Sequence, residues 1–103
     1  MRILSVRFKS STPFKDLEAS WLELAPQFNS VPGLLSKTWI NDGDVLGGIY
    51  TFRDQASIDA YAAGPIVTSM MSDPALSEFR LEQYDVLEKL SAITRGLPAA
   101  VVA

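Results

Sequence analysis

Lys37 and Trp39 stand two residues apart in the segment SKTW, and Tyr50 ends the segment GGIY. Residues two apart in a strand point to the same face of a sheet. On an apolar face a lysine ammonium can bind a substrate anion or, with a lowered pKa, act as a base. An indole offers an N–H donor and a flat surface, and a tyrosine hydroxyl can donate or relay a proton. We therefore take Lys37, Trp39 and Tyr50 as the candidate catalytic residues.

These three residues also have structural interpretations. Lys37 could lie at the end of a sheet with its ammonium in water, Trp39 could fill the core, and Tyr50 could bond to a protein partner. The chain contains no histidine and no cysteine, which excludes a Ser-His-Asp triad, a histidine base, a histidine metal ligand and a thiolate nucleophile. The proton acceptor of any reaction must then be lysine, tyrosine, a carboxylate or water.

Gly47 and Gly48 lie inside the most strand-like segment of the chain, where glycine weakens a strand. The turn NDGD predicts a hairpin that pairs Thr38 with Gly47 and Lys37 with Gly48. The side chain missing at Gly48 then leaves a hole beside Lys37 and Trp39. A β-bulge or close packing of a helix is the alternative explanation. One face of the predicted hairpin carries Leu35, Lys37, Trp39, Leu46, Gly48, Tyr50 and Phe52.

Other side chains are candidates for binding a substrate between the sheet and the helices. Tyr61 could relay a proton or serve only the fold, and Met70 could belong to an adaptable lid or to plain packing. Arg80 and Tyr84 share a face of the fourth predicted strand, where they could orient an acidic group or form rim contacts. The candidate substrate-binding residues are Trp21, Phe28, Gly48, Phe52, Tyr61, Met70, Arg80 and Tyr84.

The hydrophobic pattern predicts one domain over residues 1–103 with the element order β-α-β-β-α-β. This fold class is α+β, a ferredoxin-like split βαβ arrangement of four antiparallel strands with helices on one face. Strands are expected over 2–8, 34–40, 45–53 and 79–88, a helix capped by SSTP over 14–28, and a helix after Asp54 that is interrupted at Gly64, Pro65 and Pro74. The helix over 14–28 carries an apolar stripe of Phe14, Leu17, Trp21, Leu24 and Phe28.

The other face of this sheet has no cover from its own chain, which favours a homodimer joined through the sheet faces. Its predicted hairpin residues are small and β-branched, and such residues suit packing against a second sheet. The apolar tail over 91–103 either covers a partner subunit or is loose.

Composition excludes several classes of function. The net charge is −3 and the basic residues are scattered, so we expect no nucleic-acid partner. No segment approaches the ~18 apolar residues of a membrane span, and a cytoplasmic location is expected without membrane contact. The segment NDGDVLGG lacks the acidic spacing of a calcium loop, and neither a P-loop nor a G-x-G-x-x-G motif is present. We therefore expect no metal and no cofactor.

Short motifs within residues 32–61 together resemble a known family. They are Pro32-Gly33, Lys37-x-Trp39, Gly47-Gly48-Ile49-Tyr50 with Phe52, Ser57 and Ala60-Tyr61. This combination resembles the YdhR-like monooxygenases, a branch of the dimeric α/β-barrel superfamily that is related to the antibiotic-biosynthesis monooxygenases. The resemblance implies a ferredoxin-like protomer, a dimeric α/β barrel formed through the sheets, and one ligand cavity in each protomer.

In the related monooxygenases an electron-rich phenolic substrate reacts with oxygen without metal or flavin. The resemblance therefore implies a cofactor-independent monooxygenase that acts on a small phenolic or enolisable aromatic compound. Two other functions stay open because one fold serves many chemistries. One is an isomerase or lyase that works through an enolate, and the other is a non-catalytic protein that binds a small hydrophobic molecule.

Overall fold

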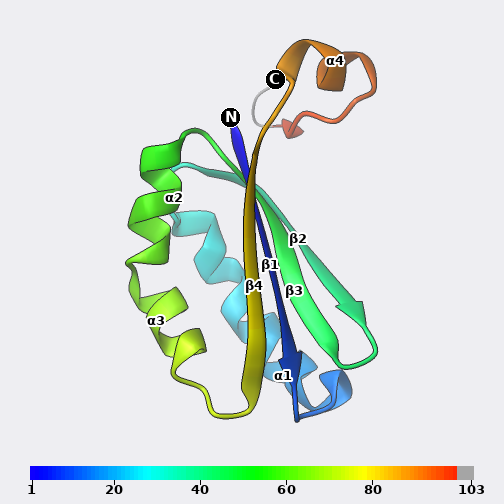
Figure 1. Cartoon of the computed structure of the whole chain (residues 1–103), viewed down its shortest axis with the longest axis vertical. Coiled ribbons are helices and arrows are strands. Elements are labelled where there is room, and N and C mark those ends of the chain that lie inside the picture. Colours follow the sequence, from blue (N-terminus) through cyan, green and yellow to red (C-terminus); the bar gives the residue numbers. More distant parts are fainter. Residues whose placement is uncertain (100–103) are drawn as a thin grey trace.

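Four antiparallel strands form a single sheet in the order β2-β3-β1-β4 (Figure 1). The computed structural model describes residues 1–99. This architecture confirms the predicted ferredoxin-like order of elements. The elements are β1 (Arg2–Ser10), α1 (Phe14–Leu24), the 3₁₀ helix η1 (Ala25–Ser30), β2 (Leu34–Asp42), β3 (Val45–Phe52), α2 (Gln55–Ala62), α3 (Pro65–Met71), β4 (Leu76–Asp85) and α4 (Glu88–Ile93).

The core lies between one face of this sheet and the helices α1, α2 and α3 (Figure 1). Strand β1 alternates as its sequence predicts, with Leu4, Val6 and Phe8 buried and their neighbours on the opposite face. The apolar stripe of α1 packs against these residues. Burial of such side chains stabilises the fold by about 1.5–3 kcal/mol each.

The predicted helix over 14–28 ends earlier than expected. The α-helix stops at Leu24 and the chain continues as the 3₁₀ helix η1, whose first turn contains Pro26. Proline has no N–H for the i→i−4 bond and clashes with the preceding turn. Phe28 therefore reaches the core from η1. The cap expected from SSTP is absent because Pro13 takes the cap position of α1, whereas Asp54 caps α2 as predicted.

The hairpin register differs from the predicted one. Asp42 pairs with Val45, so Gly43 occupies the turn with a φ of 62°, and Lys37 lies opposite Tyr50 rather than Gly48. The Asn41 side chain stabilises this turn because its amide donates to the Gly43 and Val45 carbonyls at 3.0 and 3.1 Å. The register is shifted by two residues, so each side chain keeps the face that the sequence predicts.

Leu35 is the one hairpin residue that does not keep its predicted place on the face of Lys37 and Trp39. A bulge between Leu34 and Ser36 places Leu34, not Leu35, opposite Phe52.

Strand β4 begins and ends about three residues earlier than predicted, and the segment after it contains the helix α4. Helix α4 extends beyond the end of the sheet near the N-terminus (Figure 1). The Met1 ammonium lies 3.4 Å from the Glu88 carboxylate, and the Val86 amide donates to the Met1 carbonyl. The last four residues of the predicted tail, 100–103, lie outside the described residues.

Among residues 1–99, no helix is long and apolar enough to cross a membrane. The cytoplasmic location stays a prediction.

Candidate active site

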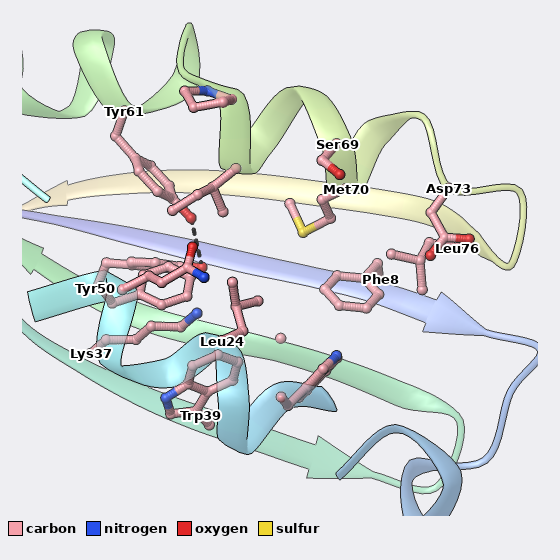
Figure 2. A pocket seen from close by; sticks show the side chains of 16 residues that line it. Phe8, Leu24, Lys37, Trp39, Tyr50, Tyr61, Ser69, Met70, Asp73 and Leu76 are labelled. Carbon is pink, nitrogen blue, oxygen red and sulfur yellow. Dashed lines mark hydrogen bonds between the residues drawn. The ribbon is translucent and has the colours of Figure 1, made fainter. Parts of the chain in front are cut away.

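A cavity of about 490 Å³ lies between the sheet and the helices. Its walls come from η1, α1, α3 and all four strands, with Tyr61 of α2 entering from the helix layer (Figure 2). In Figure 2, Lys37, Trp39, Tyr50 and Tyr61 gather at one end, and Ser69, Met70 and Asp73 lie toward the other. Its lining residues are Phe8, Trp21, Leu24, Gln27, Phe28, Lys37, Trp39, Gly47, Tyr50, Tyr61, Pro65, Ile66, Ser69, Met70, Asp73 and Leu76.

The Lys37 amine is surrounded by aromatic faces. Its Nζ lies 3.4 Å from the ring centroid of Trp39, 3.5 Å from that of Phe28 and 4.6 Å from that of Tyr50. Within residues 1–99 no carboxylate forms an ion pair with it. Lys37 therefore enters the cavity rather than reaching water at the end of the sheet.

Burial lowers the pKa of Lys37 from 10.5 to about 7. Removal from water disfavours the ammonium, and no neighbouring negative charge offsets this cost. Contact with aromatic faces acts in the opposite direction, since each close contact favours the charged form by ~0.5–2 kcal/mol. The amine can therefore accept a proton near neutral pH. The aromatic rings then stabilise the ammonium that results.

Tyr50 and Tyr61 form a hydrogen-bonded pair beside this amine. The Tyr61 hydroxyl donates to the Tyr50 hydroxyl at 3.1 Å (Figure 2). Burial raises the pKa of both hydroxyls, and the neighbouring Tyr61 raises that of Tyr50 further. Both tyrosines are therefore protonated over the physiological pH range. One bond uses one of their two hydrogens, which leaves the other hydrogen for a ligand.

The two strand glycines have different roles from those predicted. A Cβ at Gly48 would lie 2.9 Å from Cε of Lys37, so the lysine stem fills the space that was predicted to be empty. The absence of a side chain at Gly48 thus leaves room for the Lys37 side chain on the same face of the sheet. Gly48 itself does not line the cavity. Gly47 does line it, and a Cβ there would collide with the backbone carbonyl of Val6 on β1.

Seven of the predicted site residues line this cavity and four do not. Phe52 is fully buried and stacks on the Tyr50 ring beneath the cavity. Arg80 and Tyr84 lie opposite Arg7 and Ile3 and so belong to the opposite face of the sheet, where Tyr84 donates to Glu82 at 2.6 Å. The residues brought together are Trp21, Phe28, Lys37, Trp39, Tyr50, Tyr61 and Met70, and the residues excluded are Gly48, Phe52, Arg80 and Tyr84.

The sequence interpretation missed three polar residues that line the cavity. Ser69 lies on α3, Asp73 follows that helix, and Gln27 lies on η1. A signal for two of them was present, because Ile66, Ser69, Met70 and Asp73 recur at spacings of three, one and three, as on one face of a helix. The interruption expected at Pro65 obscured this pattern, although proline is well tolerated in the first turn of a helix.

A second hollow of about 460 Å³ lies on the outer side of the same residues. It shares Phe28, Lys37 and Trp39 with the main cavity. These three side chains therefore form the wall between the two spaces. Among residues 1–99, no group of three or more acidic side chains lies close enough to hold a metal ion.

Residues 3–97 match the family model described as "Putative mono-oxygenase ydhR". No curated protein matches the chain. Three solved structures with identities below 25% support the fold assignment. One is described as a "putative antibiotic biosynthesis monooxygenase" from Deinococcus radiodurans, with a TM-score of 0.67, 14% identity, and 84% of this chain and 92% of that chain covered.

The second is SnoaB, a cofactor-independent oxygenase from Streptomyces nogalater, with a TM-score of 0.66 and 17% identity over 82% of this chain and 91% of that chain. The third is MhuD, a heme-degrader from Mycobacterium tuberculosis with two hemes bound in its active site. Its TM-score is 0.64 and its identity 14%, over 84% of this chain and 96% of that chain.

Proposed function

The chain belongs to the ydhR mono-oxygenase family, and on that premise we propose that it oxygenates a small phenolic or enolisable aromatic compound without a cofactor. The observation that carries this proposal is the Lys37 amine enclosed by Phe28, Trp39 and Tyr50 inside a largely apolar cavity. Such a cavity accepts aromatic rings, and its single amine can take the proton of a phenol.

The reaction begins with transfer of the phenol proton to Lys37. The amine becomes an ammonium beside the phenolate, and this ion pair is strengthened because the rings of Phe28, Trp39 and Tyr50 shield it from part of the surrounding water. Trp39 and Phe28 hold the substrate ring against the amine, which supplies orientation. The free hydrogen of the Tyr50–Tyr61 pair donates to a second oxygen of the substrate.

Oxygen then reacts with the electron-rich ring carbon of the phenolate. A carbon–oxygen bond forms, the resulting peroxide loses water, and the ring becomes a quinone. One phenol and one O₂ thus give one quinone and one water, with no external reductant. The ammonium of Lys37 returns its proton to the departing oxygen, which regenerates the neutral amine.

Haem chemistry has no support in the residues of this cavity. The chain contains neither histidine nor cysteine, which are usual ligands of haem iron. Methionine ligates haem iron together with a histidine, which this chain lacks, and the cavity tyrosines Tyr50 and Tyr61 bond to each other. The cavity residues do not fit a haem iron, and the proposed oxygenation has no step that uses one.

We propose further that two copies associate through their open sheet faces. In residues 1–99 no helix covers this face (Figure 1). On β2, on β3 and in the first half of β1, the residues of this face are small or β-branched, which suits flat packing of one sheet on another. They are Ile3, Ser5, Thr38, Ile40, Val45, Ile49 and Thr51.

Oxygen consumption with electron-rich dihydroxynaphthalenes tests the proposed reaction. We expect uptake above the uncatalysed rate, and Tyr61→Phe should lower kcat about tenfold because it breaks the donor pair. Tyr84→Phe is the matched control, since Tyr84 lies on the opposite face of the sheet. Its kcat should equal that of the unaltered chain.

Three results would contradict an oxygenase. Absence of uptake with every phenol tested would exclude it. Product formation under nitrogen would indicate an isomerase or lyase, and saturable binding without turnover would indicate a binding protein.

A further inference from the structure

We propose that Lys37 forms a Schiff base with aromatic aldehydes or ketones that enter the cavity, which gives the chain a carbonyl chemistry independent of oxygen. The proposal depends on the surroundings of one nitrogen atom. This atom lies inside the cavity against three aromatic rings, and no carboxylate among residues 1–99 forms an ion pair with it. It does not rest on the proposed oxygenase.

The aromatic rings favour the product of this reaction. A protonated Schiff base is a delocalised cation, and the faces of Phe28, Trp39 and Tyr50 attract cations. The same rings offer stacking surfaces to the aromatic group of the aldehyde. The carbonyl compound and the amine are therefore held together before they react, which lowers the entropic cost of their encounter.

The groups needed for proton transfer are also present. The Nζ lone pair attacks the carbonyl carbon, a carbon–nitrogen bond forms, and the carbonyl electrons move to oxygen. Transfer of one proton from nitrogen to that oxygen gives the carbinolamine. The oxygen then takes a second proton and leaves as water, so one amine and one carbonyl give one Schiff base and one water. The Tyr50–Tyr61 pair carries the spare hydroxyl hydrogen that can assist this departure.

Charged groups near Lys37 are few. The titratable side chains that line either hollow beside it are Tyr50, Tyr61 and Asp73. Both tyrosines stay neutral, and Asp73 lies toward the other end of the cavity (Figure 2). Burial lowers the pKa of Lys37, so a large share of the amine is free to react at neutral pH.

The other lysines serve as internal controls. Lys9 pairs with Glu78 at 3.3 Å, whereas Lys15 on α1 and Lys89 on α4 are exposed to solvent. These three lysines lie outside the cavity and make no cation–π contact with its aromatic rings. Any selectivity of a carbonyl reagent for Lys37 therefore reports on the cavity.

The test uses benzaldehyde with sodium cyanoborohydride, which reduces a Schiff base to a stable benzyl amine. Peptide mapping by mass spectrometry at pH 7 then shows which amine carries the benzyl group. We expect labelling of Lys37 to be on the order of a hundredfold faster than that of Lys15 or Lys89, because burial lowers the pKa of Lys37 and the cavity holds benzaldehyde beside its amine. A saturable dependence on benzaldehyde concentration should accompany it.

Labelling spread evenly over Lys15, Lys89 and the N-terminus, or no labelling of Lys37, would overturn the proposal. The peptide map of the unaltered chain decides this even if a variant fails to fold. Lys37→Arg keeps a cation but cannot form a Schiff base, so it should lose only the Lys37 label. Labelling without oxygen uptake would contradict the oxygenase alone, and oxygen uptake without labelling would contradict the Schiff base alone.

Discussion

Lys37→Met is expected to make the protein more stable and at the same time nearly inactive. The gain arises because methionine fills a similar volume without the cost of burying an ammonium. Burial lowers the pKa of Lys37 from 10.5 to about 7. After a reduction for solvent screening and for the lost aromatic contacts, we expect about 2 kcal/mol more free energy of unfolding at pH 7.

The stability cost of Lys37 should depend on pH in a defined direction. Between pH 7 and 10.5 the unfolded chain holds the Lys37 proton and the folded chain does not. The stability of the unaltered protein therefore rises with pH through this range, and the cost of Lys37 is greatest below pH 7. The advantage of Lys37→Met should shrink as the pH rises toward 10.5.

Urea unfolding of both proteins at several pH values measures this difference, with Lys15→Met as the matched control on the exposed surface of α1. Turnover should fall about a thousandfold with Lys37→Met, because a base in the site typically contributes 10²–10⁴-fold. A variant that loses stability, or that gains it equally at every pH, would show that the amine is charged and well solvated.

Gly47→Ala should cost about 3 kcal/mol of stability or more. A Cβ at this position would collide with the carbonyl oxygen of Val6, which belongs to the backbone of the central strand β1. Backbone cannot move aside as a side chain can, so relief requires separation of β1 from β3. Thermal unfolding should show a correspondingly lower Tm.

Gly48→Ala is the control for this prediction. Its Cβ would meet Cε of Lys37 at 2.9 Å and Cε1 of Tyr50 at 3.2 Å, and the lysine stem is flexible. We expect stability to change by no more than about 1 kcal/mol while kcat falls about tenfold, because the amine is displaced. Equal destabilisation by the two substitutions would contradict the distinct roles of these glycines.

The faces of the hairpin could be predicted from the sequence, although its register could not. Side chains in strands alternate with a period of two, so a register error of two residues left Lys37, Trp39 and Tyr50 on one face. The turn that sets the register depends on amide bonds from Asn41, and the dipeptide Asp42-Gly43 does not reveal them.

The sequence also could not predict which side chain fills the space beside Gly48. A missing side chain leaves room, but only the structure shows which neighbour fills it. Here the occupant is the stem of Lys37 itself. For Arg80 and Tyr84 the sequence did hold a signal, since Phe79 and Leu81 alternate with them and mark the other face as the apolar one.

The state of the Lys37 amine can be measured directly by NMR titration of its ¹³Cε and ¹⁵Nζ resonances, assigned with Lys37→Arg. The structure predicts a midpoint of about 7, since the amine is buried among aromatic rings without a carboxylate partner. A midpoint near 10.5 would mean that burial does not lower the pKa of Lys37 and that the amine stays charged near pH 7. Neither the base of the proposed oxygenation nor the nucleophile of the Schiff base would then exist.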